Sequence, residues 1–97
     1  MIRVSYIYAI GSDDFSAIKI GYSSYPKGRL YALQNANPYK LKLWGVWGPW
    51  KQTDIRTVEY VIHNTFKDKK LRGEWFDVTI NDVNNSLYGY EYDEREE

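Results

Sequence analysis

The sequence predicts a small α+β domain: a mainly antiparallel β-sheet flanked by helices, with the element order β-β-α-β-α-β-α. Two neighbouring segments near the N-terminus are rich in β-branched and aromatic residues, as in a β-hairpin. Two segments with helix-start signals follow, and a short strand-like run comes after each of them. The 97 residues contain no internal repeat and no linker composition, so residues 1–90 are expected to form a single domain.

The first elements are a hairpin and a helix. Residues 3–11 (RVSYIYAIG) and 17–23 (AIKIGYS) predict two strands, which the turn-rich segment GSDDFS joins. Pro26 suits the first turn of a helix, because its missing N–H would have no partner there. This helix runs to about Asn35, and NANP ends it because the residue before Pro38 avoids the helical region.

The next elements are a strand and an amphipathic helix. Residues 40–47 (KLKLWGVW) alternate and predict a third strand. Thr53 or Asp54 can cap the following helix, which ends in the basic run KDKKLR. Its apolar residues recur at helical spacing: Ile55, Val58, Ile62 and Phe66.

A short strand and a short helix complete the domain. Residues 73–78 (GEWFDV) predict the strand, and Asn81 is expected to cap a helix that runs to about Leu87. Two of three closely spaced tryptophans should belong to the core and the third to an exposed surface. The three tryptophans are Trp44, Trp47 and Trp50.

The charge is balanced overall but unevenly distributed. The last seven residues, EYDEREE, hold five acids and one base, so residues 1–90 carry a net charge of about +4. A mildly basic body suits a phosphate backbone, and ordinary surface charge is the alternative explanation. Residues 91–97 are expected to form a disordered acidic tail.

The composition also excludes several classes of protein. Without cysteine, neither disulfides nor a thiolate metal site can support the fold. No apolar run approaches the roughly 20 residues of a membrane helix, and the N-terminus does not resemble a signal peptide. We therefore expect a cytoplasmic protein with no membrane partner.

Two ionisable residues of the second helix stand out from its apolar pattern. Glu59 falls within or at the edge of the apolar stripe, and His63 lies four residues on, on the same face. A carboxylate buried there without a partner is costly, so Glu59 requires a cation, a hydrogen-bond donor or a metal. A structural ion pair with Arg29 or Lys19 is the alternative to a metal site.

The predicted hairpin adds further polar groups. Side chains alternate faces along a strand, so Tyr6 and Tyr8 share one face, as do Lys19 and Gly21. Pairing of these faces would gather two phenols, an ammonium and bare backbone, with Arg29 overhanging them from the next helix. Phosphodiester hydrolysis requires such a set: cations for the phosphoryl oxygens, a carboxylate for a divalent metal and a base for water.

These residues resemble the GIY-YIG nuclease superfamily, specifically its short phage-type branch of DNA-binding domains. The two half-motifs are similar to YIY at residues 6–8 and KIG at residues 19–21. Arg29, eight residues past Gly21, matches the helix arginine of the family, and Glu59 matches its metal-binding glutamate. The later segments EYVIHNTF and GEWFDV also resemble that branch, so the resemblance covers most of the chain.

The resemblance implies a metal-dependent DNA endonuclease, a hydrolase that uses a single divalent metal, Mg²⁺ or Mn²⁺. Glu59 would hold the metal, and Tyr8 would help to activate the attacking water. Lys19 and Arg29 would be the cations at the scissile phosphate, and Lys19 and the metal would supply positive charge to Tyr8. His63 would transfer protons or support Glu59, and a plain helix histidine is the alternative.

The sequence departs from the family pattern at both half-motifs. Tyr6 stands where glycine is usual, and Lys19 replaces the second tyrosine, for which Tyr22 or Tyr25 is a candidate substitute. No residue matches the late asparagine of the family. Two alternatives therefore stay open: a catalytically weak or inactive nucleic-acid-binding module, and a protein-interaction module.

The remaining candidates concern nucleic-acid contacts. They are Tyr6, Gly21, Tyr22, Lys27, Lys67 and Lys70. For the lysines after the second helix, a solvated helix end is the alternative. Glu74 is a candidate second acidic group near the site. A domain this small would have little sequence specificity alone, so besides DNA we expect a homodimer or a targeting partner protein.

Overall fold

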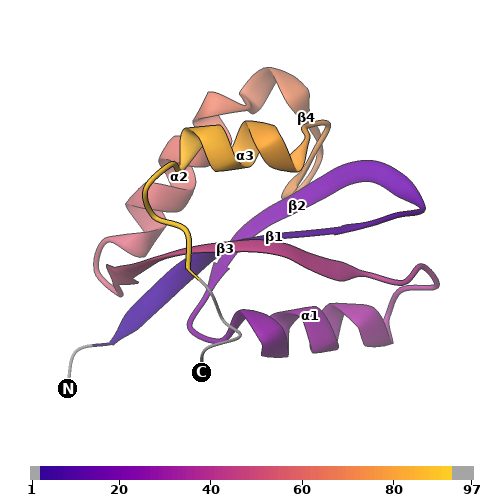
Figure 1. The fold of residues 1–97 in the computed structure, drawn as a ribbon, viewed down its shortest axis with the longest axis horizontal. Helices are drawn as coiled ribbons and strands as arrows, with labels where there is room; N and C mark the ends of the chain where they lie inside the picture. The colour runs from indigo at the N-terminus through magenta and orange to yellow at the C-terminus, as the bar shows by residue number, and fades with distance from the viewer. Residues whose placement is uncertain (1–2, 93–97) are drawn as a thin grey trace.

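The computed structural model describes residues 3–92. A five-stranded sheet, with the order β3-β1-β2-β5-β4 and antiparallel pairing throughout, forms its central layer. In Figure 1, α2 and α3 cover one face of the sheet and α1 covers the other. The predicted α+β class is confirmed.

The elements follow the predicted order, with one further edge strand. They are β1 (Val4–Ser12), β2 (Phe15–Ser23), α1 (Pro26–Asn35), β3 (Lys42–Lys51), α2 (Ile55–Thr65), the 3₁₀ turn η1 (Lys67–Lys69), β4 (Lys70–Arg72), β5 (Trp75–Phe76) and α3 (Ile80–Ser86). Among the described residues, no helix has the length and the apolar run that a membrane span requires.

The sheet separates two apolar layers, because side chains alternate faces along each strand. The larger layer lies under α2 and α3, and its buried members include Ile7, Ile20, Trp47, Ile55, Phe76 and Val83. The smaller layer lies under α1. Tyr8, Ile10 and Leu41 are buried there, with Leu30 and Leu33 of α1 packed against them.

Several predicted boundaries need correction. The hairpin turn is only Asp13 and Asp14, because Ser12 already pairs with Phe15. The third strand runs on to Lys51, since β3 stays paired with β1 over its whole length. The basic run KDKKLR is not a helix end; it forms η1 and the exposed edge strand β4.

The cap of α3 is Thr79 and not Asn81. Its hydroxyl accepts a hydrogen bond from Asp82 N at 3.1 Å, and the Asp82 carboxylate accepts one from Thr79 N at 2.9 Å. This reciprocal capping box satisfies two backbone N–H groups at the start of α3. Asn81 is therefore an exposed residue in the first turn of the helix.

The first two residues of the expected acidic tail lie against the sheet. Gly48 N donates to Tyr90 O at 2.8 Å and Tyr92 N donates to Val46 O at 2.9 Å, with Glu91 opposite Trp47. The segment from Tyr90 to Tyr92 therefore covers the outer edge of β3. Residues 93–97 of the expected tail lie outside the described residues.

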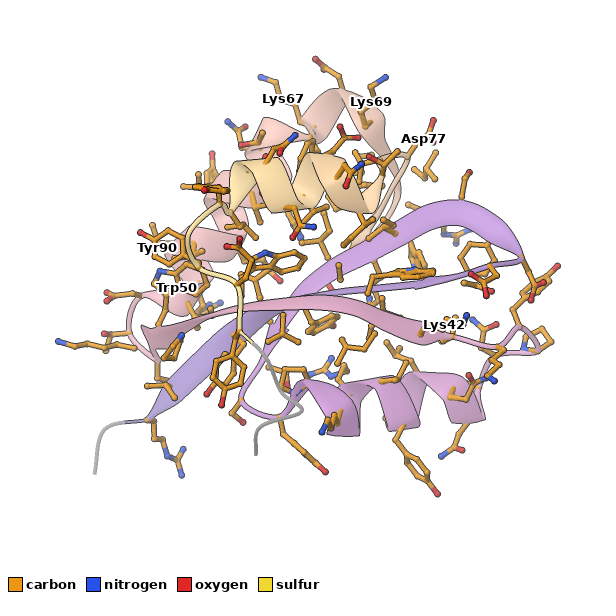
Figure 2. The ribbon with its side chains drawn as sticks, in the orientation of Figure 1. Lys42, Trp50, Lys67, Lys69, Asp77 and Tyr90 are labelled. Atoms are coloured by element: carbon orange, nitrogen blue, oxygen red, sulfur yellow. The ribbon has the colours of Figure 1, made fainter. Side chains whose placement is uncertain are left out.

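The three tryptophans divide as predicted, two in the core and one exposed. Trp47 is buried, and Trp50 packs against the larger layer. Figure 2 shows Trp50 beside Tyr90, with ring centroids 4.9 Å apart. Trp44 is 38% exposed, with Lys42 Nζ 5.6 Å from its ring centroid.

Candidate functional site

The candidate site lies at the edge of β2, beside the start of β5. β5 pairs with β2 only through Ile18 and Lys19, and Ile20 N then donates to Glu74 O at 2.9 Å. Past this point α2 borders the strand, since His63 Nε2 lies 2.7 Å from Ile20 O. Because β5 pairs with β2 over only two residues, side chains from α2 and from the β4–β5 turn can meet at one edge of the sheet.

A carboxylate–imidazole cluster forms there from Glu59, His63 and Glu74. One ligand atom from each residue lies within 4.8 Å of the others. Glu59 and His63 stand one turn apart on α2, as the sequence predicts. Glu74 comes from the two-residue loop between β4 and β5, whose other residue, Gly73, has a φ of 57°. Glycine takes that conformation without strain.

Tyr8 reaches this cluster from the opposite face of the sheet. It lies opposite Gly21 in the β1–β2 pair and is wholly buried. A Cβ built on Gly21 would stand 2.7 Å from Tyr8 Cζ and 3.0 Å from Glu74 Oε1. The missing side chain at position 21 therefore lets the phenol lie across β2, beside the carboxylate.

The two predicted cations both lie at the site, and they act on different partners. Lys19 Nζ forms an ion pair with Glu74 Oε1 at 3.0 Å. Arg29, in the first turn of α1, lowers the pKa of Tyr8 by its charge and by its approach to the phenol. The prediction that Lys19 supplies positive charge to Tyr8 therefore needs correction: Arg29 supplies it, and Lys19 neutralises Glu74.

Burial and like charge shift two pKa values in the cluster. Burial, followed by the charge of Glu74 and a hydrogen bond to it, raises the pKa of Glu59 to about 7. Burial, followed by the charge of Glu74, raises the pKa of Tyr8 to about 12, which Arg29 only partly opposes. Near neutral pH Glu59 is therefore protonated for part of the time, and Tyr8 is a neutral phenol.

Two buried oxygens at the cluster have no hydrogen-bond partner of good geometry within the described residues. They are Tyr8 Oη and Glu59 Oε2. Buried polar atoms are rarely left unpaired in native structures, because each unpaired group costs about 1–3 kcal/mol. The two oxygens lie beside two carboxylates and an imidazole, which together can hold a cation.

Tyr6 and Tyr22 both pack against other side chains of the fold. The Tyr6 ring packs against Tyr92, with centroids 4.8 Å apart. Tyr22 packs against the larger apolar layer, because it faces away from its neighbour Gly21.

The predicted lysine contacts lie around the site rather than in it. Lys27 is exposed on α1, two residues before Arg29. Lys67 and Lys70 are exposed beyond the end of α2, and Figure 2 shows Lys67 pointing outward at the tip of the molecule.

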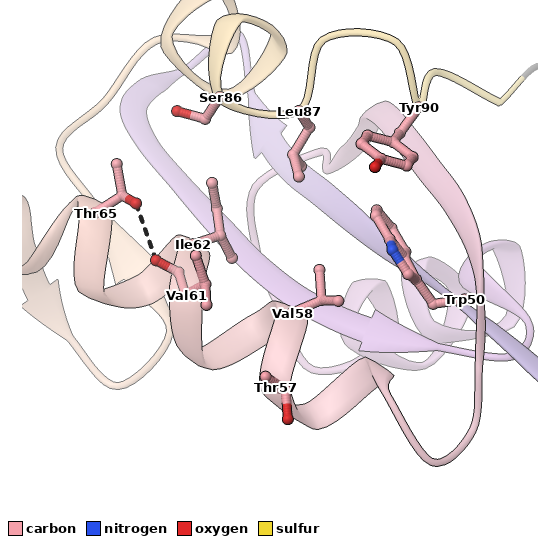
Figure 3. Close-up of a pocket in the computed structure, with 9 residues that line it drawn as sticks. All are labelled: Trp50, Thr57, Val58, Val61, Ile62, Thr65, Ser86, Leu87 and Tyr90. Atoms are coloured by element: carbon pink, nitrogen blue, oxygen red, sulfur yellow. Dashed lines mark hydrogen bonds between the residues drawn. The ribbon is translucent and has the colours of Figure 1, made fainter.

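A separate groove of about 260 Å³ lies between α2, the end of β3 and the C-terminal end of α3 (Figure 3). Its apolar lining comes from Trp50, Val58, Val61, Ile62, Leu87 and Tyr90. None of the cluster residues lines this groove. It is therefore a surface depression distinct from the candidate site.

The fold and the site together define a small α+β protein with a carboxylate–imidazole–phenol cluster at the edge of its sheet. The chain belongs to the T5orf172 domain family, whose model matches residues 5–88. That match spans all the cluster residues. Comparison with curated proteins and with solved structures gives no match.

Proposed function

We propose that this chain is a GIY-YIG-type endonuclease that hydrolyses phosphodiester bonds in DNA with a divalent metal, Mg²⁺ or Mn²⁺. One observation carries the proposal: the unpaired phenol of Tyr8 lies over Gly21, beside the carboxylate of Glu74. That carboxylate forms a cluster with the ligand atoms of Glu59 and His63. The T5orf172 domain supports a nucleic-acid-related role.

The donor set fits a hard or borderline divalent cation. Glu59 and Glu74 provide carboxylate oxygens, which Mg²⁺ and Mn²⁺ prefer. His63 Nε2 lies 2.7 Å from the Ile20 carbonyl oxygen, which can only accept a hydrogen bond. The Nε2 atom therefore carries the hydrogen, and the Nδ1 lone pair of the neutral ring is available as a ligand. A ring N–H held by a carbonyl is the usual support of a metal-binding histidine.

The side chains divide the chemistry among themselves. The metal, when bound, would stabilise charge on the phosphoryl oxygens and make water a better nucleophile. Tyr8 Oη would accept a hydrogen bond from that water and orient it. Arg29 would hold the scissile phosphate by charge-assisted hydrogen bonds. Lys19 would hold the Glu74 carboxylate in place through their ion pair.

The test is nicking of supercoiled plasmid with Mg²⁺ or Mn²⁺, comparing the wild type with Glu59→Gln. The amide keeps the shape of Glu59 and removes its charge, so nicking should vanish while the fold remains. Asn64→Ala, an exposed change on the same helix, is the control and should cleave like the wild type. Absence of nicking by a folded wild type with either metal would overturn the proposal.

A catalytically weak or inactive nucleic-acid-binding module is the second candidate. Two observations favour it: Lys19, in place of a second tyrosine, is engaged with Glu74, and the pKa of Tyr8 is raised to about 12. Salt-dependent DNA binding without cleavage would select this function. Binding of neither metal nor DNA would leave a protein-interaction module. A homodimer or a targeting partner stays a prediction.

A further inference from the structure

Tyr25 is a large aromatic residue held in a fixed position on the surface. It is 65% exposed, yet its ring lies directly on the backbone of Gly28. A Cβ built on Gly28 would stand 2.5 Å from Tyr25 Cδ2 and 2.8 Å from Cε2. Tyr25 N donates to Ser23 Oγ at 2.9 Å, and Tyr25 O accepts from Arg29 N at 3.2 Å. The ring is thus both exposed and constrained.

The glycine at position 28 of α1 is explained by the packing of the Tyr25 ring. A glycine inside a helix destabilises the helix relative to alanine. Gly28 has an ordinary negative φ, so the backbone conformation does not require glycine there. All three close contacts of a Cβ at this position would be with the Tyr25 ring. The glycine therefore leaves room for one edge of the Tyr25 ring against the helix.

The ring adjoins the candidate site. Tyr25 immediately precedes α1, and Arg29 stands one turn into that helix. The charge of Arg29 acts on Tyr8, so its guanidinium lies beside the cluster. A phosphate held by Arg29 would have its sugar and base within reach of the Tyr25 ring.

We propose that Tyr25 stacks on an unpaired base next to the phosphate held at Arg29, and that the preferred substrate is single-stranded or locally unpaired DNA. This inference rests on the proposed function. Base–aromatic stacking is how proteins bind unpaired bases without sequence readout. In a duplex the faces of the bases are covered by their neighbours, so a flat surface ring has no base to contact.

The test measures DNA binding in EDTA, so that cleavage plays no part. Fluorescence anisotropy would compare a single strand with a duplex of the same sequence, at one fixed salt concentration. Tyr25→Ala should weaken single-strand binding by about tenfold to a hundredfold, the contribution of one stacked base, and leave duplex binding unchanged. Tyr25→Phe keeps the ring and should bind like the wild type.

Gly28→Ala provides a second variant that leaves the tyrosine in place. Its new Cβ must displace the ring, so single-strand binding should fall as in Tyr25→Ala. Its thermal stability should stay the same or rise, because alanine favours the helix. Tyr88→Ala, at a residue that is 81% exposed just after α3, is the matched control and should change neither affinity.

The outcomes separate this inference from the proposed function. Failure of the wild type to bind single strands, equal losses for both DNA forms, or no loss in Tyr25→Ala would each overturn the stacking role. Glu59-dependent nicking in the parallel plasmid assay would then still support the nuclease. Conversely, Tyr25-dependent binding without any nicking supports the stacking role and overturns the nuclease.

Discussion

Tyr8 and Gly21 lie opposite each other in the β1–β2 pair, and the Tyr8 phenol fills the space that a side chain at position 21 would take. Tyr8 is wholly buried, so its ring has no freedom to move aside. This pairing is what connects the α1 face of the sheet to the cluster at the edge of β2.

Gly21→Ala should therefore damage both stability and activity. The new Cβ would stand 2.7 Å from Tyr8 Cζ, and overpacking of this kind costs about 1–3 kcal/mol. Urea unfolding should show the loss, and plasmid nicking should fall with it. Ser16→Ala, at an exposed position of the same strand, should change neither measurement. Wild-type stability in Gly21→Ala would contradict this packing.

Tyr8→Phe should separate activity from stability. The Tyr8 hydroxyl is buried and unpaired, so its removal should leave stability unchanged or raise it by up to about 1 kcal/mol. Cleavage should fall by about 10²-fold, because the attacking water would lose the oxygen that orients it. Tyr6→Phe is the control, because its ring packs against Tyr92 outside the cluster. A clear loss of stability in Tyr8→Phe would show that the hydroxyl has a structural partner.

The pKa of Glu59 predicts how stability depends on pH without metal. Burial and Glu74 raise this pKa from 4.5 to about 7, so the folded state favours the protonated carboxyl. The resulting stabilisation is fully present below about pH 4.5 and is lost as the pH rises through about 7. Thermal melts in EDTA should show the wild type losing stability relative to Glu59→Gln across this window. A constant difference between the two proteins would contradict the raised pKa.

Glu74→Gln should move the same transition to lower pH. The charge of Glu74 is the largest cause of the raised pKa of Glu59 after burial, so its removal lets Glu59 ionise more easily. If Glu74 is also a metal ligand, Mn²⁺ binding measured by titration calorimetry should weaken in the same variant. Asp77→Asn, an exposed change after β5, is the control for both measurements. Unchanged Mn²⁺ affinity would remove Glu74 from the donor set.

Local patterns in the sequence predicted the element types well, because side-chain periodicity and capping chemistry act over a few residues. They misplaced element ends where distant pairing decides them. β3 continues to Lys51 because β1 lies alongside it, and Glu91 lies on the sheet edge because β3 offers unpaired backbone there. The cap at Thr79 was missed although its reciprocal partner, Asp82, stands at the expected spacing.

For the site, the sequence by itself determined which residues are chemically unusual: Glu59 in an apolar stripe, Lys19 in an apolar strand and Gly21 after it. Only the tertiary structure decided their partners. Lys19 pairs with Glu74, Arg29 supplies positive charge to Tyr8, and Tyr22 packs against the larger apolar layer. The physical reason is that these contacts depend on how far β5 pairs along β2. Pairing between distant strands is set by the packing of the whole sheet rather than by local preference.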